Sequence, residues 1–130
     1  MATISKSWAA AAQIEGSGDG YTTLSGTTEA YSSDVDLETS GYEGAHVIVE
    51  INFDGTPTDD VKVKLYGSLD GSNYDDVPLW EMTIDNGVDP CQISFVVRDL
   101  AHFRLGFQQT GATDSHDVRA YQQSWYYTSA

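Results

Sequence analysis

The side chains best able to do chemistry are three histidines and one cysteine, and their spacing argues against an active site. His46, His102 and His116 each fall on the polar phase of an alternating pattern, without a His or Cys partner at zinc-ligand spacing. We therefore expect them at the surface or rim of the fold. Cys91 lies in the apolar run CQISFVV, which favours a buried and unreactive thiol. No serine stands in a nucleophile-elbow sequence, and no glycine-rich phosphate loop precedes a helix, so we expect no enzymatic activity.

Acidic side chains are concentrated in two turns, and oxygen ligands of this kind suit a hard cation such as calcium. One turn contains Asp70, Asn73, Asp75 and Asp76, and the other lies within residues 54–60. The spacing does not follow the EF-hand pattern, and Asp-Gly and Asn turns form without a metal. We therefore expect no cofactor, and calcium at the first turn is the alternative.

Aromatic side chains are the remaining candidates for binding, because they anchor protein–protein contacts and also form platforms for sugars. We assign contacts with a partner protein to Trp8, Trp125, Tyr126 and Tyr127. The residues considered for a sugar platform are Trp80, Trp125, Tyr126, Tyr127, Tyr66 and Tyr74. Trp80 is flanked by apolar residues and Trp125 closes a strand, so we favour protein contacts over a sugar platform.

The composition describes one strongly acidic domain. Its 130 residues include 20 acidic and six basic side chains, for a formal net charge of −14. This charge repels phosphate backbones and anionic lipid heads, so we expect neither nucleic acid nor a membrane as a partner. Cys91 is the only cysteine, which excludes an intrachain disulfide. The sequence shows no signal peptide and no apolar run of membrane-spanning length, which predicts synthesis in the cytoplasm without export through a signal peptide.

The positions of apolar residues predict about eight strands and no long helix. Val61, Val63 and Leu65 alternate with polar residues and begin a hairpin that spans residues 61–84. The other predicted strands cover residues 21–24, 34–39, 45–53, 91–97, 102–109 and 116–127. Val35 and Leu37 alternate with acids, which indicates a solvent-facing edge. Short strands separated by Gly, Asp, Asn and Pro turns predict an all-β fold, an antiparallel β-sandwich of the jelly-roll type.

Residues 1–20 are predicted to form an extended N-terminal arm, and residues 21–130 the β-sandwich domain. Trp8 and Ala9–Ala12 precede a glycine stretch, Gly16–Gly20, which interrupts regular structure. Two possibilities remain for Trp8: it packs on its own domain, or another subunit receives it.

The turn Tyr66–Tyr74, which contains GSLDGSNY between two strands, resembles small all-β virion proteins of tailed bacteriophages. The segments Ser40–Val49 and Leu100–Leu105 add to the likeness, which extends from about Tyr42 to Phe107. Some of these proteins are head decoration (cement) proteins, and others are tail or neck components. No residue roles follow from the resemblance, because the group has no catalytic set.

The resemblance implies a non-enzymatic capsid decoration protein that binds the major capsid protein on the outer surface of a phage head and stabilises the shell. It also implies a virion location, synthesis in the host cytoplasm and a homo-oligomer, usually a trimer. A strongly acidic domain suits this outer surface, and an arm bearing Trp8 adds avidity by reaching a neighbouring subunit. The alternatives are a carbohydrate-binding β-sandwich module and a phage tail or neck appendage component.

Overall fold

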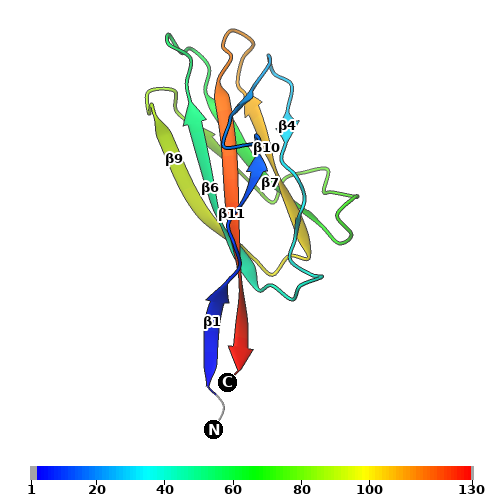
Figure 1. The fold of residues 1–130 in the computed structure, drawn as a ribbon. Coiled ribbons are helices and arrows are strands. Elements are labelled where there is room, and N and C mark those ends of the chain that lie inside the picture. The colour runs from blue at the N-terminus through cyan, green and yellow to red at the C-terminus, as the bar shows by residue number, and fades with distance from the viewer. Residues whose placement is uncertain (1–2, 130) are drawn as a thin grey trace.

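Two antiparallel sheets pack face to face in the computed structural model, which describes residues 3–129 (Figure 1). The first sheet contains β1 (Ile4–Trp8), β2 (Ala12–Glu15), β3 (Thr22–Thr23), β6 (Gly44–Asn52), β9 (Cys91–Arg98) and β11 (Asp117–Ser129). The second sheet contains β4 (Ala30–Tyr31), β5 (Val35–Asp36), β7 (Val61–Ser68), β8 (Trp80–Ile84) and β10 (His102–Gln109). The predicted antiparallel β-sandwich is confirmed.

The strand order in both sheets is that of a jelly roll. The first sheet runs β1-β11-β6-β9, and β2 and β3 pair with β11 along the same edge as β1. The second sheet runs β4-β10-β7-β8, and β5 pairs with β10 beside β4. The eleven strands of the described residues thus fill eight positions, because β1–β3 share one position and β4–β5 share another. From β8 to β11 each successive strand lies in the other sheet, as in a jelly roll.

The core lies between the sheets and consists of the side chains that the alternating pattern assigned to it. The buried side chains of β6, β7 and β10 include Ala45, Val47, Val49, Ile51, Val61, Val63, Leu65, Phe103, Leu105 and Phe107. Burial of each Phe, Leu, Ile or Val stabilises the fold by about 1.5–3 kcal/mol. Cys91 is buried at the start of β9, as predicted. None of the described segments forms an apolar helix of membrane-spanning length.

The hairpin predicted for residues 61–84 is present as β7 and β8, with Val61 opposite Ile84 and Leu65 opposite Trp80. The strand pattern resumes at Val77 in the sequence, which predicts a second strand over Val77–Ile84. The observed strand begins at Trp80, so the connection is longer than the sequence indicated. Within it, the Asp70 carboxylate accepts hydrogen bonds from the backbone N–H groups of Ser72 and Asn73, at 2.9 and 2.8 Å. This is the turn chemistry expected of an Asp-Gly-Ser-Asn sequence.

The solvent-facing edge predicted around Val35 and Leu37 is present, because β5 pairs only with β10 among the described strands and lies at the edge of the second sheet. Val35 and Leu37 are only 4% and 1% exposed. β5 pairs with the first residues of β10, and the N–H of Leu37 donates to the carbonyl oxygen of Ala101 at 2.9 Å. The apolar side chains of this segment therefore close one end of the core, while the alternating acids, Asp34, Asp36 and Glu38, stay exposed.

A buried polar network joins the loops at the opposite end of the sandwich. His116 is fully buried, which corrects the prediction of a surface histidine. Its Nδ1 accepts from the N–H of Asp54 at 2.9 Å, and its Nε2–H donates to the carbonyl oxygen of Asp59 at 2.8 Å. The Asp114 carboxylate accepts from the N–H groups of Thr58 and Asp59, and the Asp59 carboxylate accepts from those of Thr113 and Asp114. The bond from the Asp59 N–H is the main cause of a lowered pKa at Asp114.

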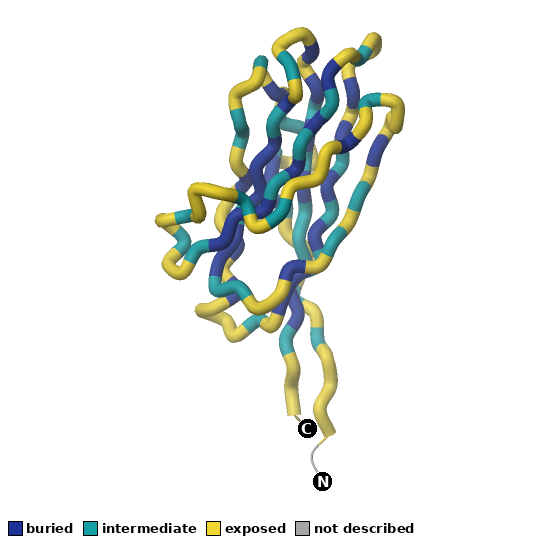
Figure 2. The backbone as a smooth tube through the Cα atoms, turned by 180° about the vertical axis from the view of Figure 1, so that it is seen from behind, coloured by how far each residue is buried: buried dark blue, intermediate teal, exposed yellow. Residues whose placement is uncertain are grey.

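The first strand leaves the sandwich together with the end of the last one (Figure 1). Ile4–Trp8 pairs with Trp125–Ser129, whereas the pairing of β6 with β11 stops at Trp125. The two strands therefore project as a two-stranded ribbon, which is mostly exposed (Figure 2). β2 and β3 follow along β11, so the segment predicted as an arm is paired with the C-terminal strand.

Replacement of Gln109 by Ala tests the buried polar network. The Gln109 amide donates to the carbonyl oxygens of Gly26 and Asp114 at 3.0 and 2.7 Å and accepts from the N–H of His116 at 2.8 Å. We expect Gln109→Ala to lower the free energy of unfolding by about 2–3 kcal/mol in urea titrations, because buried polar groups lose their partners. The exposed Gln92 supplies the control, and Gln92→Ala should change stability by less than about 0.5 kcal/mol. Equal losses in both variants would contradict the role of the network.

Candidate functional site

Two of the predicted interaction residues meet where the ribbon leaves the sandwich. Trp8 lies directly opposite Trp125 in the β1–β11 pairing, and their rings pack edge to face with centroids 5.6 Å apart at an angle of 61°. Trp125 also lies opposite Gly44 of β6. A Cβ atom at Gly44 would overlap the Trp125 ring, so only glycine leaves space for this indole. The outer face of the first sheet therefore holds Trp125 at 3% exposure, while Trp8 remains 46% exposed.

Two cationic side chains surround this tryptophan pair. The Lys6 Nζ lies 4.5 Å from the ring centroids of both Trp8 and Trp125, and the Arg98 guanidinium lies 5.8 Å from that of Trp125. Neither cation has a carboxylate within ion-pair distance among residues 3–129.

The other four basic residues are already engaged. Lys62, Lys64 and Arg119 form ion pairs with carboxylates at Glu81, Glu29 and Glu50, respectively. The Arg104 guanidinium lies 3.8 and 4.0 Å from the ring centroids of Tyr31 and Tyr74. Within the described part of the chain, Lys6 and Arg98 are the cations that are both exposed and without a carboxylate at ion-pair distance, whereas the other four are half-buried.

A shallow hollow of about 350 Å³ connects these residues into one surface. Its lining consists of Lys6, Trp8, His46, Val96, Arg98 and Trp125. Strand alternation places Ile4 on the same side as Lys6 and Trp8, and Tyr127 lies directly opposite Lys6. Ile4, Val96 and Tyr127 are 72%, 58% and 50% exposed. We call the surface made by these eight residues the ribbon face.

The four interaction residues predicted from the sequence do not all lie on this surface. Trp8, Trp125 and Tyr127 belong to the ribbon face, but Tyr126 points to the other side of the ribbon and packs near Tyr42, with ring centroids 6.0 Å apart. Sequence reasoning missed the other groups that complete the surface, which are Ile4, Lys6, His46, Val96 and Arg98. The sequence could have indicated Lys6, because it lies two residues before Trp8 and residues two apart in a strand share a face.

Three of the aromatic residues considered for a sugar platform, Trp80, Tyr66 and Tyr74, are engaged within the protein. The Trp80 ring packs edge to face on Phe95 with centroids 4.7 Å apart. The hydroxyl of Tyr66 donates to the Glu29 carboxylate, and the hydroxyl of Tyr74 donates to the Asp34 carboxylate. Burial is the largest cause of a raised pKa at both tyrosines, and these hydrogen bonds add to it.

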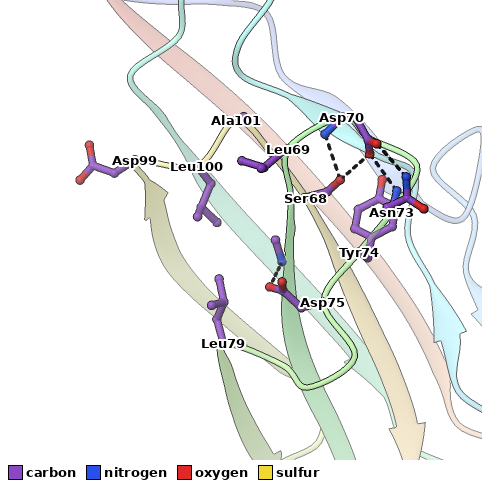
Figure 3. Close-up of a pocket in the computed structure, with 11 residues that line it drawn as sticks. Ser68, Leu69, Asp70, Asn73, Tyr74, Asp75, Leu79, Asp99, Leu100 and Ala101 are labelled. Atoms are coloured by element: carbon purple, nitrogen blue, oxygen red, sulfur yellow. Dashed lines mark hydrogen bonds between the residues drawn. The ribbon is translucent and has the colours of Figure 1, made fainter.

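A second hollow, of about 440 Å³, lies at the ribbon end of the sandwich beside the β7–β8 connection (Figure 3). Three leucines and three carboxylates characterise its lining, and we call it the leucine hollow: Leu69, Leu79, Leu100, Asp70, Asp75 and Asp99. Asp75 accepts from the N–H of Gly67 at 3.0 Å, and Asp70 holds its own turn. Across residues 3–129, no three His, Cys, Asp or Glu side chains are grouped so as to hold a metal ion.

His102 joins the second sheet to the acids of the β5 segment, which corrects its prediction as an ordinary surface histidine. It is only 8% exposed. Its Nδ1 lies 2.8 Å from Asp34, and its Nε2 lies 3.7 Å from Asp36 and 3.6 Å from Glu38. The hydrogen bond to Asp34 is the main cause of a raised pKa at His102, and the three negative charges add to it.

The packing of the Trp125 ring on Gly44 can be tested by substitution of the glycine. We expect Gly44→Ala to displace the indole, because the new Cβ would overlap the ring and the carbonyl oxygen of Val97. The variant should melt at a lower temperature and show red-shifted tryptophan fluorescence as Trp125 meets water. Gly55→Ala is the matched control, since a Cβ there meets no atom within 4 Å. An unchanged emission spectrum in Gly44→Ala would contradict the packing described.

The raised pKa of His102 makes a prediction for stability against pH. Since the folded-state pKa lies above that of the unfolded chain, protonated His102 stabilises the fold. This contribution is fully present below the unfolded pKa of about 6.5 and is lost as the pH rises through the raised folded-state pKa. We expect the melting temperature of the wild type to fall over this range and His102→Gln to remove that part of the fall. A pH profile for His102→Gln identical to that of the wild type would refute the assignment.

Comparisons with known proteins identify the fold and no family. No protein-family model matches the sequence, and no curated protein matches it either. A solved structure from work on Bacillus endospore appendages, described as disulfide-linked pili, matches with a TM-score of 0.50 and 14% identity, over 97% of this chain and 89% of that one. The Yersinia pseudotuberculosis-derived mitogen matches with a TM-score of 0.47 and 9% identity, over 96% of this chain and 86% of that one. The two sheets and the Bacillus neighbour confirm the small all-β fold implied by the resemblance to virion proteins. Neither neighbour is described as a phage protein.

Proposed function

We propose that the protein is a non-enzymatic structural protein that decorates the outer surface of a bacteriophage head and binds the major capsid protein. The observation that carries this proposal is the exposed ribbon with its apolar and cationic face. The ribbon is a means of attachment, because it adds nothing to the core of its own domain and presents side chains that suit a partner.

The ribbon has little support within its own chain. Beyond Trp125, the described part of β11 pairs only with β1. Two-stranded ribbons are at best marginally stable in water, and their free edges offer unpaired N–H and C=O groups to another chain. Contact with a second surface would give these N–H and C=O groups hydrogen-bond partners and would bury Ile4, Trp8 and Tyr127. Such exposed aromatic residues are typical anchors of protein interfaces.

Charge distinguishes the ribbon from the rest of the molecule. The formal net charge is −14, yet neither residues 3–8 nor residues 125–129 include an acid. Lys6 and Arg98 therefore stand out as local positive charges on an anionic domain. A field of this kind orients the domain, with its acidic bulk away from an anionic genome and its ribbon toward a protein partner.

One solved neighbour is consistent with a structural role. The Bacillus structure comes from endospore appendages described as disulfide-linked pili, so a protein of similar fold is associated with an assembly. Linear linkage by disulfides requires two cysteines in each subunit, and these 130 residues contain only the buried Cys91. Assembly of the present chain would therefore rest on noncovalent contacts.

The proposal predicts that the ribbon face determines binding to heads. We expect Trp8→Ala combined with Lys6→Gln to raise the dissociation constant by about tenfold or more, because an aromatic anchor and its cation are removed. Binding is measured by co-sedimentation with phage heads assembled from purified major capsid protein. Lys62→Gln removes the same charge from an exposed ion pair with Glu81, so it should leave binding unchanged. Unaltered occupancy by the double variant, with melting temperatures near that of the wild type, would overturn the proposal.

A further inference from the structure

The ribbon face and the leucine hollow are complementary to each other in chemistry. We propose that the leucine hollow of one copy receives the ribbon of a second copy, so that the protein assembles with itself through a head-to-tail contact. This inference rests on the proposed function and concerns the protein before it meets a shell: in solution the ribbon is received by the leucine hollow of a second copy, and on a head the capsid protein takes the place of that hollow. No binding partner has been assigned to the leucine hollow so far.

The first element of complementarity is apolar surface. Leu69 and Leu79 are 87% and 55% exposed beside the hollow, and Leu100 lines its wall (Figure 3). The ribbon offers Ile4 and Tyr127, which are 72% and 50% exposed. Exposed aliphatic side chains grouped around a hollow mark a contact site in soluble proteins. A ribbon strand laid across the hollow would remove both sets from water.

The second element is charge. The described lining of the leucine hollow includes Asp70, Asp75 and Asp99 and no basic side chain. The ribbon face has the reverse composition, with Lys6 and Arg98 and no carboxylate among its described residues. Opposite charges at a contact select the partner and its orientation, and like charges exclude the wrong one. Two ribbons therefore repel at their cations, and two hollows repel at their acids, which leaves ribbon to hollow as the matched contact.

The third element is geometry. The ribbon of a given copy points away from its own sandwich, so it is directed at a neighbour (Figures 1 and 2). Arg98 lines the ribbon-face hollow and the next residue, Asp99, lines the leucine hollow. The two surfaces thus adjoin at the end of β9, and each copy presents its cationic side to one neighbour and its acidic side to the other. A contact between two different surfaces closes into a ring or continues as a fibre.

Two single variants test the contact, each with one surface defective. Lys6→Glu places an acid on the ribbon and leaves the hollow intact, and Leu79→Lys places a cation at the hollow and leaves the ribbon intact. We expect sedimentation equilibrium between about 1 µM and about 1 mM to show assembly of the wild type, with association at least tenfold weaker in either variant alone. An equimolar mixture should recover heterodimers or larger species, because intact ribbons then meet intact hollows and the introduced glutamate meets the introduced lysine. Val88→Lys, at an exposed residue of the β8–β9 turn, is the control and should assemble as the wild type does.

The outcomes separate this inference from the proposed function. A wild type that remains monomeric throughout the range, or a mixture that remains as monomeric as its components, overturns the ribbon-to-hollow contact. Undiminished assembly of Leu79→Lys also overturns it. Binding of the monomeric protein to heads would still uphold the proposed function in those cases. Assembly that follows the expected pattern without any binding to heads would uphold the inference and overturn decoration.

Discussion

The structure depends on the hydrogen-bond ladder of β11. This 13-residue strand pairs with β6 on one side and with β3, β2 and β1 in turn on the other. At about 3.4 Å per residue it is about 44 Å long, and it extends four residues beyond its nine-residue neighbour β6. Its register places Trp125 between Gly44 and Trp8, and its last four residues continue into the ribbon. The core, the aromatic pair and the exposed projection thus follow from a single strand.

Several aspartates of this protein hold turns and loops through their carboxylates. Asp70 caps its own turn, Asp36 accepts from the N–H groups of Glu38 and Thr39, and Asp59 and Asp114 bind the backbone of each other's loops. Carboxylates that accept backbone N–H bonds are stable in the charged form, so loops that need no metal still accumulate negative charge. The high net charge is therefore in part a consequence of fixing long loops with Asp, and it leaves few cations for the surface.

The sequence predicted what depends on local pattern and missed what depends on register. The period of two was sufficient for the core of β6, β7, β9 and β10, because neighbours on one strand face share an environment. It misplaced His116 and His102, since their burial is decided by loops and strands far away in the chain. Trp8 and Trp125 were both predicted to bind, but their contact required the β1–β11 register, which no local pattern reveals.

Self-assembly through the ribbon must overcome the repulsion between copies that each bear a formal charge of −14. That repulsion acts over long distances and is screened beyond roughly 8 Å at physiological salt. The attraction between Lys6 and the acids of the leucine hollow acts at contact, where the surrounding apolar groups exclude water and ions. Moderate salt therefore weakens the repulsion between copies more than it weakens the attraction between the ribbon and the leucine hollow. An acidic domain with one cationic ribbon is thus suited to association at physiological ionic strength, with the matched surfaces deciding which contact forms.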